Sequence, residues 1–197
     1  MTRLLAPILA TAVVMLLSAT AAAQVRMIRL DEITQEVTIK NFGSGDVDVS
    51  AYQMCRSPGN YQALSVLTLL EGDLDLSPGE EVSFIYGAIL STGTGIGLYS
   101  DTGFGDPNDM ADYMQYKGVP GFREDVAVLA GLWTAGEFAA GDSGPYLYTG
   151  DGIDDYGAAF WVPEPGSTLL GSAALAVIAW RKRTAPSAGR GADGRRC

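Results

Sequence analysis

Short segments in which polar and apolar residues alternate, separated by glycine turns, constrain the fold of this chain most. Polar and apolar side chains alternate in Glu36–Asn41, and residues 43–45 (Gly-Ser-Gly) follow as a turn. Valine then alternates with aspartate and serine in Asp46–Ser50, as in a strand with one solvent-exposed face. The chain holds 25 glycines, enough for turns of this kind along its whole length.

Further segments have the same character, and only one has helical spacing. The other expected strands are Val25–Leu30, Val66–Leu70, Val82–Tyr86, Ile96–Tyr99, Met110–Tyr116, Tyr146–Tyr148 and Ala158–Trp161. In Arg123–Trp133, by contrast, apolar residues recur at helical spacing, which predicts a short helix. The pattern predicts an all-β fold, an immunoglobulin-like antiparallel β-sandwich with one short helix.

Charge and composition exclude several functions. Lys and Arg total 13 against 23 Asp and Glu, the net charge is −10, and the chain contains no histidine. A chain this acidic lacks the basic surface of a nucleic-acid-binding protein. Without histidine it also lacks Ser-His and Cys-His catalytic pairs and His-ligated zinc.

The first 23 residues have the composition of a secretory signal peptide. Arg3 forms a positive n-region, Leu4–Leu17 an apolar h-region, and residues 21–23 are three alanines that fit the small-residue cleavage rule. A transmembrane anchor or a buried helix is the alternative. The ending in small residues just before Gln24 favours a cleaved signal and therefore export.

The C-terminus carries a second signal in three parts. Residues 162–166 read Val-Pro-Glu-Pro-Gly, an apolar run spans residues 168–180, and Arg181, Lys182 and Arg183 follow at once. Two prolines are expected to end any preceding strand and to leave an accessible stretch. As a helix the apolar run would reach roughly 20 Å, short of the about 30 Å hydrocarbon core, so it is expected to act as a temporary membrane stop. The basic cluster is expected to remain cytoplasmic.

This order of parts closely resembles a PEP-CTERM sorting signal, which exosortases recognise in Gram-negative bacteria that produce exopolysaccharide. The resemblance covers residues 162–183 and implies that Val162, Pro163, Glu164, Pro165 and the basic cluster form the sorting motif. It implies a short transmembrane helix, transient inner-membrane anchoring, and a cut near Pro163 to Pro165. Residues 184–197 depart from the pattern, because such signals usually end soon after the basic cluster; they are expected to form a cytoplasmic tail that is removed.

The segment between the two signals resembles a bacterial lamin-tail domain. The similarity lies in the order of short motifs: Asn41 and Gly43 after a strand, Val47–Tyr52, and then Leu-Ser-Pro-Gly at residues 76–79. The chain departs from the family where Ala51 and Tyr52 replace the usual Gly-Trp. The family implies an immunoglobulin-like sandwich over residues 24–161 that serves as a binding or structural module, and it supplies no catalytic residues.

The segment of residues 24–161 is more acidic than the whole chain, because it holds six of the 13 basic residues but 21 of the 23 acidic ones. Cys55 would be its only cysteine, since Cys197 lies beyond the expected cut. A disulfide between them is therefore not expected, and Cys55 is expected to be a small buried hydrophobic residue.

Two acidic loops are candidates for calcium, because hard cations prefer oxygen ligands. The candidate ligands are Asp101, Asp106 and Asp109 in the first loop, with Asn108 and Asp112 beside them, and Asp151, Asp154 and Asp155 in the second. Neither loop has EF-hand spacing. The alternative is that these aspartates cap turns and face water.

We therefore expect an exported, non-catalytic protein that acts in structure or binding at the cell surface or in the extracellular matrix. Exosortase, the membrane during sorting and an exopolysaccharide or other surface proteins are its expected partners, and no cofactor is expected. One alternative is a secreted carbohydrate-active enzyme that uses two carboxylates. Another is a calcium-dependent structural module. Aromatic residues that could stack on sugars cluster late in this segment, at Tyr146, Tyr148, Tyr156, Phe160 and Trp161.

Overall fold

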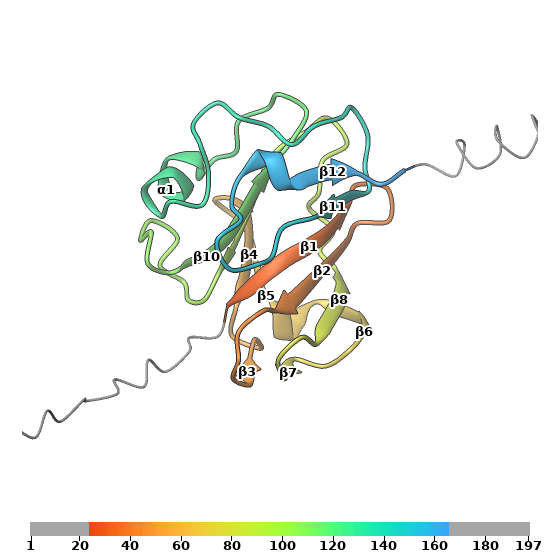
Figure 1. Cartoon of the computed structure of the whole chain (residues 1–197), viewed down its shortest axis with the longest axis vertical. Coiled ribbons are helices and arrows are strands. Elements are labelled where there is room, and N and C mark those ends of the chain that lie inside the picture. The colour runs from red at the N-terminus through yellow and green to blue at the C-terminus, as the bar shows by residue number, and fades with distance from the viewer. Residues whose placement is uncertain (1–23, 166–197) are drawn as a thin grey trace, which may run out of the picture.

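The computed structural model describes residues 24–165, which form an all-β body of antiparallel sheets (Figure 1). The larger sheet has six strands in the spatial order β12-β11-β1-β2-β8-β6. Their bounds are β1 Val25–Asp31, β2 Glu36–Asn41, β6 Thr68–Glu71, β8 Glu81–Ile85, β11 Tyr146–Tyr148 and β12 Trp161–Pro163. The described part of the chain therefore begins with a strand inside this sheet and ends with a strand at its edge.

A second sheet has four strands in the order β10-β9-β4-β5, and a two-stranded ribbon pairs β3 with β7. Their bounds are β3 Val47–Asp48, β4 Gln53–Ser57, β5 Asn60–Ala63, β7 Asp75–Leu76, β9 Gly95–Tyr99 and β10 Met110–Gln115. Every pairing between named strands is antiparallel. The expected all-β, antiparallel architecture is confirmed.

Side chains from both sheets form one hydrophobic core. Met27 and Ile39 enter it from the six-stranded sheet, and Met54 and Leu98 enter it from the four-stranded sheet, all without solvent exposure. In β2 the buried Val37 and Ile39 are partnered by Phe84 and Val82 of β8 in register. The alternation seen in the sequence is thus the alternation between a core face and an outer face.

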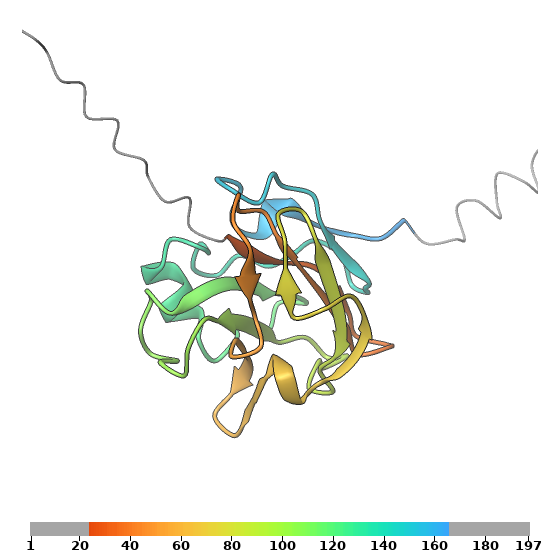
Figure 2. The same cartoon turned by 90° about the horizontal axis from the view of Figure 1, so that it is seen from below.

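The expected helix is confirmed, although it is short. Helix α1, Glu124–Leu129, buries Val126 and Ala127 and lies beside β10, at one side of the molecule (Figures 1 and 2). Its first turn carries two acidic residues, which suit the positive end of the helix dipole.

Three strands and two 3-10 helices differ from the sequence expectation. Strands β4, β5 and β7 were not expected, because adjacent residues are buried in β4 and partly exposed residues dominate β5. The expected strand Ala158–Trp161 is wrong in part: residues 158–160 form a 3-10 helix, and the strand begins at Trp161. Likewise, Leu64–Val66 is a 3-10 helix, and the strand after it begins at Thr68.

Candidate functional site

The first half of the expected sorting motif belongs to the sheet. Val162 pairs with Leu147, and Pro163 pairs with Tyr146, so both motif residues lie in β12. The expectation that the prolines end the strand before the motif is therefore corrected, since Pro163 is itself the last strand residue. Proline is tolerated here because β12 is an edge strand and needs no partner on its outer side.

The contacts continue for one residue beyond the strand. The backbone N–H of Glu164 donates a hydrogen bond to the carbonyl oxygen of Pro145, with an N–O distance of 2.7 Å. The Glu164 carboxylate lies 3.9 Å from Nη2 of Arg29. Both Glu164 and Pro165 are exposed. The chain is thus attached to the sheet through Glu164 and leaves it at Pro165, at the outer edge of the body (Figure 1).

Gly141 leaves the room in which Pro163 packs. A Cβ atom added at Gly141 would lie 2.6 Å from Cγ of Pro163, closer than side chains approach one another. Gly141 also has a φ of +98°, which L side chains rarely adopt. This contact cannot be predicted from a local sequence pattern, because the two residues are far apart along the chain.

The late aromatic residues pack on one another instead of forming an open platform. Tyr146 and Trp161 are fully or almost fully buried, and Tyr148, Tyr156 and Phe160 are half-buried. The ring of Tyr148 lies 5.8 Å from that of Trp161, and its hydroxyl donates to the carbonyl oxygen of Asp155. These rings therefore hold β11, β12 and the preceding loop together.

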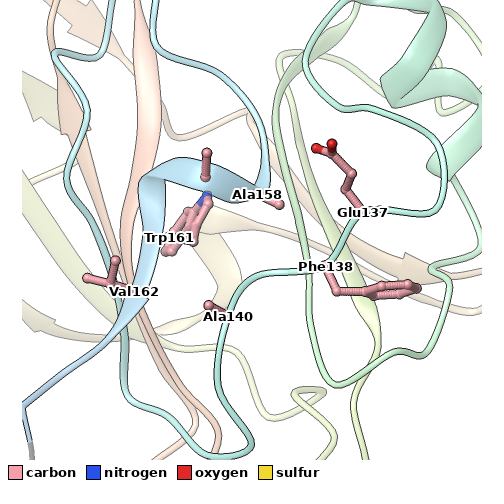
Figure 3. A pocket seen from close by; sticks show the side chains of 7 residues that line it. Glu137, Phe138, Ala140, Ala158, Trp161 and Val162 are labelled. Atoms are coloured by element: carbon pink, nitrogen blue, oxygen red, sulfur yellow. The ribbon is translucent and has the colours of Figure 1, made fainter.

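A shallow hollow of about 350 Å³ lies beside β12 (Figure 3). Two segments line it, residues 137–140 on one side and residues 158–162 on the other. Trp161 and Val162 form part of its wall, and Figure 3 shows Phe138 and Glu137 on the facing loop. Among its lining residues Glu137 is the one titratable side chain, so the pair of carboxylates that a glycosidase needs is not gathered at this hollow.

A buried ion pair joins the two sheets where β1 and β10 approach each other. Nη1 of Arg26 lies 3.4 Å from Oδ1 of Asp112, and both side chains are almost fully buried. The Asp112 carboxylate also accepts hydrogen bonds from the backbone N–H of Met27 and of Tyr113. The Arg26 guanidinium lies over the ring of Tyr156, 3.6 Å from its centroid, which ties the loop before β12 to the sheet.

Burial dominates the acidity of Asp112. Removal from water raises its pKa to about 6, although the nearby Arg26 charge and the two backbone N–H groups lower it. In the sequence Asp112 belongs both to the acidic loop of calcium candidates and to the expected strand Met110–Tyr116, and its place just before Tyr113 favours a structural role.

A second ion pair secures the turn after β10. Nζ of Lys117 lies 2.6 Å from the carboxylate of Glu32 and 2.7 Å from the carbonyl oxygen of Ser91. Glu32 also accepts a hydrogen bond from the N–H of Gly144. These groups connect four loops, and the sequence did not single them out.

The candidate calcium ligands lie in exposed turns. Oδ1 of Asp106 accepts hydrogen bonds from the side chain and backbone of Asn108, and Oδ1 of Asp151 accepts from three backbone N–H groups, those of residues 153–155. Within residues 24–165, no group of three or more His, Cys, Asp or Glu side chains is arranged to hold a metal ion. No such cluster in this part of the chain therefore includes the remaining candidates, which are Asp101, Asp109, Asp154 and Asp155.

Cys55 is buried, and within residues 24–165 its thiol forms no disulfide. Burial raises the pKa of this thiol, although the Arg123 charge opposes the shift, so the reactive thiolate is disfavoured.

The rest of the expected sorting apparatus lies outside the described residues. This applies to the signal peptide of residues 1–23, the apolar run of residues 168–180 and the cluster Arg181, Lys182 and Arg183. In residues 24–165, no helix has the length and apolar character needed to cross a membrane.

Comparison with known proteins adds no relative: no family model, no curated protein and no solved structure matches this chain.

Proposed function

We propose that this chain is an exported surface or extracellular-matrix protein of a Gram-negative bacterium, sorted by an exosortase. A signal peptide at residues 1–23 starts export, and residues 162–183 hold the chain in the inner membrane until the tail is cut off. Residues 24–161 form an immunoglobulin-like, lamin-tail-type module with a structural or binding role, linked to exopolysaccharide or biofilm.

The observation that carries this proposal is the position of the motif on the body. Val-Pro-Glu-Pro begins in the edge strand β12, and its last three residues are exposed at the point where the chain leaves the sheet. A processing enzyme needs such an exposed exit, and the order of proline motif, apolar run and basic cluster continues from it.

The use of the buried acids supports a non-catalytic role. Asp112 is engaged by Arg26 and two backbone N–H groups, and Glu32 is engaged by Lys117 and Gly144. Each carboxylate therefore connects structural elements, and neither lines the hollow beside β12.

The sorting claim is tested by removing the basic cluster in the native host. The variant Arg181→Gln, Lys182→Gln, Arg183→Gln should lose tail processing and accumulate at full length, while the natural chain is recovered shortened from the envelope surface and medium. A matched control replaces Arg190, Arg195 and Arg196 by Gln, which removes the same charge further along the tail. Equal processing of both variants and the natural chain would contradict the proposal.

The binding claim is tested with polysaccharide from the same host. Protein recovered from the medium should sediment with the polysaccharide and leave its chain length unchanged. Release of oligosaccharides would favour the carbohydrate-active enzyme instead, and failure to sediment would remove the polysaccharide as a partner.

A further inference from the structure

Part of the proposed sorting motif is a structural strand of the body. Trp161 is 2% exposed, and its ring packs against that of Tyr148. Val162 and Pro163 pair with β11, and the Glu164 N–H donates a hydrogen bond to the carbonyl oxygen of Pro145. Freeing these four residues from the sheet breaks the pairing with β11 and exposes the Trp161 ring.

Proteases commonly bind their substrates as extended strands, through the backbone N–H and C=O groups of the substrate. In β12 the backbone groups that face β11 are already engaged in the sheet. Pro163 is also seated against Gly141, where no side chain fits. Pro163 and Glu164 are exposed to solvent as well, but both are held by the sheet, through the pairing with Tyr146 and the bond to Pro145. The chain is therefore first free of the sheet beyond Glu164, at the exposed Pro165.

We infer that the sorting cut falls on the C-terminal side of Glu164, so that residues 161–164 stay with the body as its last strand. This inference rests on the proposed function. In the cut, water or another acceptor nucleophile attacks the carbonyl carbon of a peptide bond beyond Glu164 and forms a new bond to it. The C–N bond of that peptide breaks, and the proton of the nucleophile passes to the leaving amine. The retained strand explains why the motif begins inside the sheet instead of in a free linker.

The test maps the C-terminal residue of protein released by the native host, using mass spectrometry of its C-terminal peptide. An end at Glu164 or shortly beyond it supports the inference. An end at Val162 or Pro163 overturns the inference and leaves the proposed function standing. An end at Cys197 contradicts the proposed function itself.

A second arm needs no sorting enzyme. Purified full-length chain is treated with a protease of broad specificity, and the C-terminus of the resistant body is mapped. It should lie at or beyond Glu164; trimming of the natural chain to Phe160 or Trp161 overturns the inference.

Two glycine variants test whether the seat of Pro163 sets this boundary. Gly141→Ala places a Cβ 2.6 Å from Pro163 and should shift the boundary upstream, into residues 161–163. Gly136→Ala is the matched control, because Gly136 also has a positive φ, +77°, but open space around the added Cβ. It should leave the boundary unchanged. An unchanged boundary in a folded Gly141→Ala protein would show that this contact does not protect the strand.

Discussion

Arg26 is the residue on which the junction of the two sheets depends. Its guanidinium neutralises Asp112, donates from Nε to the carbonyl oxygen of Gly152 and lies over the ring of Tyr156. Its Nη2 atom is buried and has no hydrogen-bond partner among the described residues, so this donor offsets part of the favourable contacts. A buried pair of this kind is costly to break, because the remaining charge has no solvent to stabilise it.

Replacement of Arg26 by Met should destabilise the protein at neutral pH. Without its cation the ionised form of Asp112 is strongly disfavoured in the core, so the fold must either bury an unpaired charge or take up a proton, and the free energy of unfolding should fall by about 3 kcal/mol. Arg29→Met is the matched control, because Arg29 is partly exposed and its pairs should contribute about 1 kcal/mol or less. Urea denaturation measures both, and equal losses would contradict the role assigned to Arg26.

The pH dependence of this loss has a definite sign. The pKa of Asp112 is raised to about 6 in the fold, from 3.8 for an unperturbed carboxyl, so between about pH 4 and pH 6 the folded state binds more protons at this residue than the unfolded state. The contribution of Asp112 to stability therefore decreases as pH rises through this window. The loss caused by Arg26→Met should be larger at pH 7 than at pH 4, where Asp112 is neutral. A loss that grows on acidification would refute this assignment.

The contribution of Asp31 to stability depends on pH with the opposite sign. Its burial is outweighed by hydrogen bonds from Ile33 and Thr34 and by the Arg29 charge, which lower its pKa. Its stabilising contribution is therefore present at neutral pH and is lost as pH falls below about 4. The Asp31→Asn variant should be less stable than the natural chain at pH 7, and the difference in unfolding free energy should shrink toward pH 3. A difference independent of pH would contradict this account.

Among the elements, two strands have the bounds expected from sequence. In Glu36–Asn41 the fully buried Val37 and Ile39 are separated by the polar Thr38, and Tyr146–Tyr148 is a run of large apolar residues typical of strands. Strand β4 was not predicted, because the adjacent Met54 and Cys55 are both buried and the pairing with β5 is irregular after Cys55. The sequence of β4 therefore does not alternate between polar and apolar residues. The packing of Pro163 on Gly141 was not predicted either, since contacts between segments that are distant along the chain leave no local sequence pattern.

Strand β12 should be needed for stability, which comparison of two chain ends can test. A chain that ends after Phe160 loses the buried Trp161 and the pairing with β11, and its unfolding free energy should fall by about 3 kcal/mol or more. A chain that ends after Pro165 keeps both and should match the full-length chain in thermal unfolding. Equal melting temperatures for the two shortened chains would show that β12 is dispensable.

At the scale of the whole molecule, charge is the dominant feature. Residues 24–161 hold 21 acidic and six basic residues, and four of the basic ones, Arg26, Arg29, Lys40 and Lys117, are engaged in ion pairs. Such an excess of one sign destabilises a compact body through self-repulsion, and salt reduces this repulsion.

Added salt should therefore stabilise the protein. The melting temperature should rise as NaCl increases from about 10 mM to about 0.3 M at pH 7, and the rise should be much smaller near pH 4.3, the isoelectric point of the chain. Calcium chloride at equal ionic strength should give the same rise. A larger rise with calcium at submillimolar concentration would instead support the calcium-dependent module.

The central claim is that both ends of this chain are removed while the sandwich and its last strand are kept. The intact mass of protein recovered from the native host's envelope and medium tests it most directly. The account predicts a mass that corresponds to a start at Gln24 and an end at or shortly beyond Glu164, with or without an added group. A mass that includes Arg181–Cys197 would contradict it, because the tail would then be a permanent part of the protein.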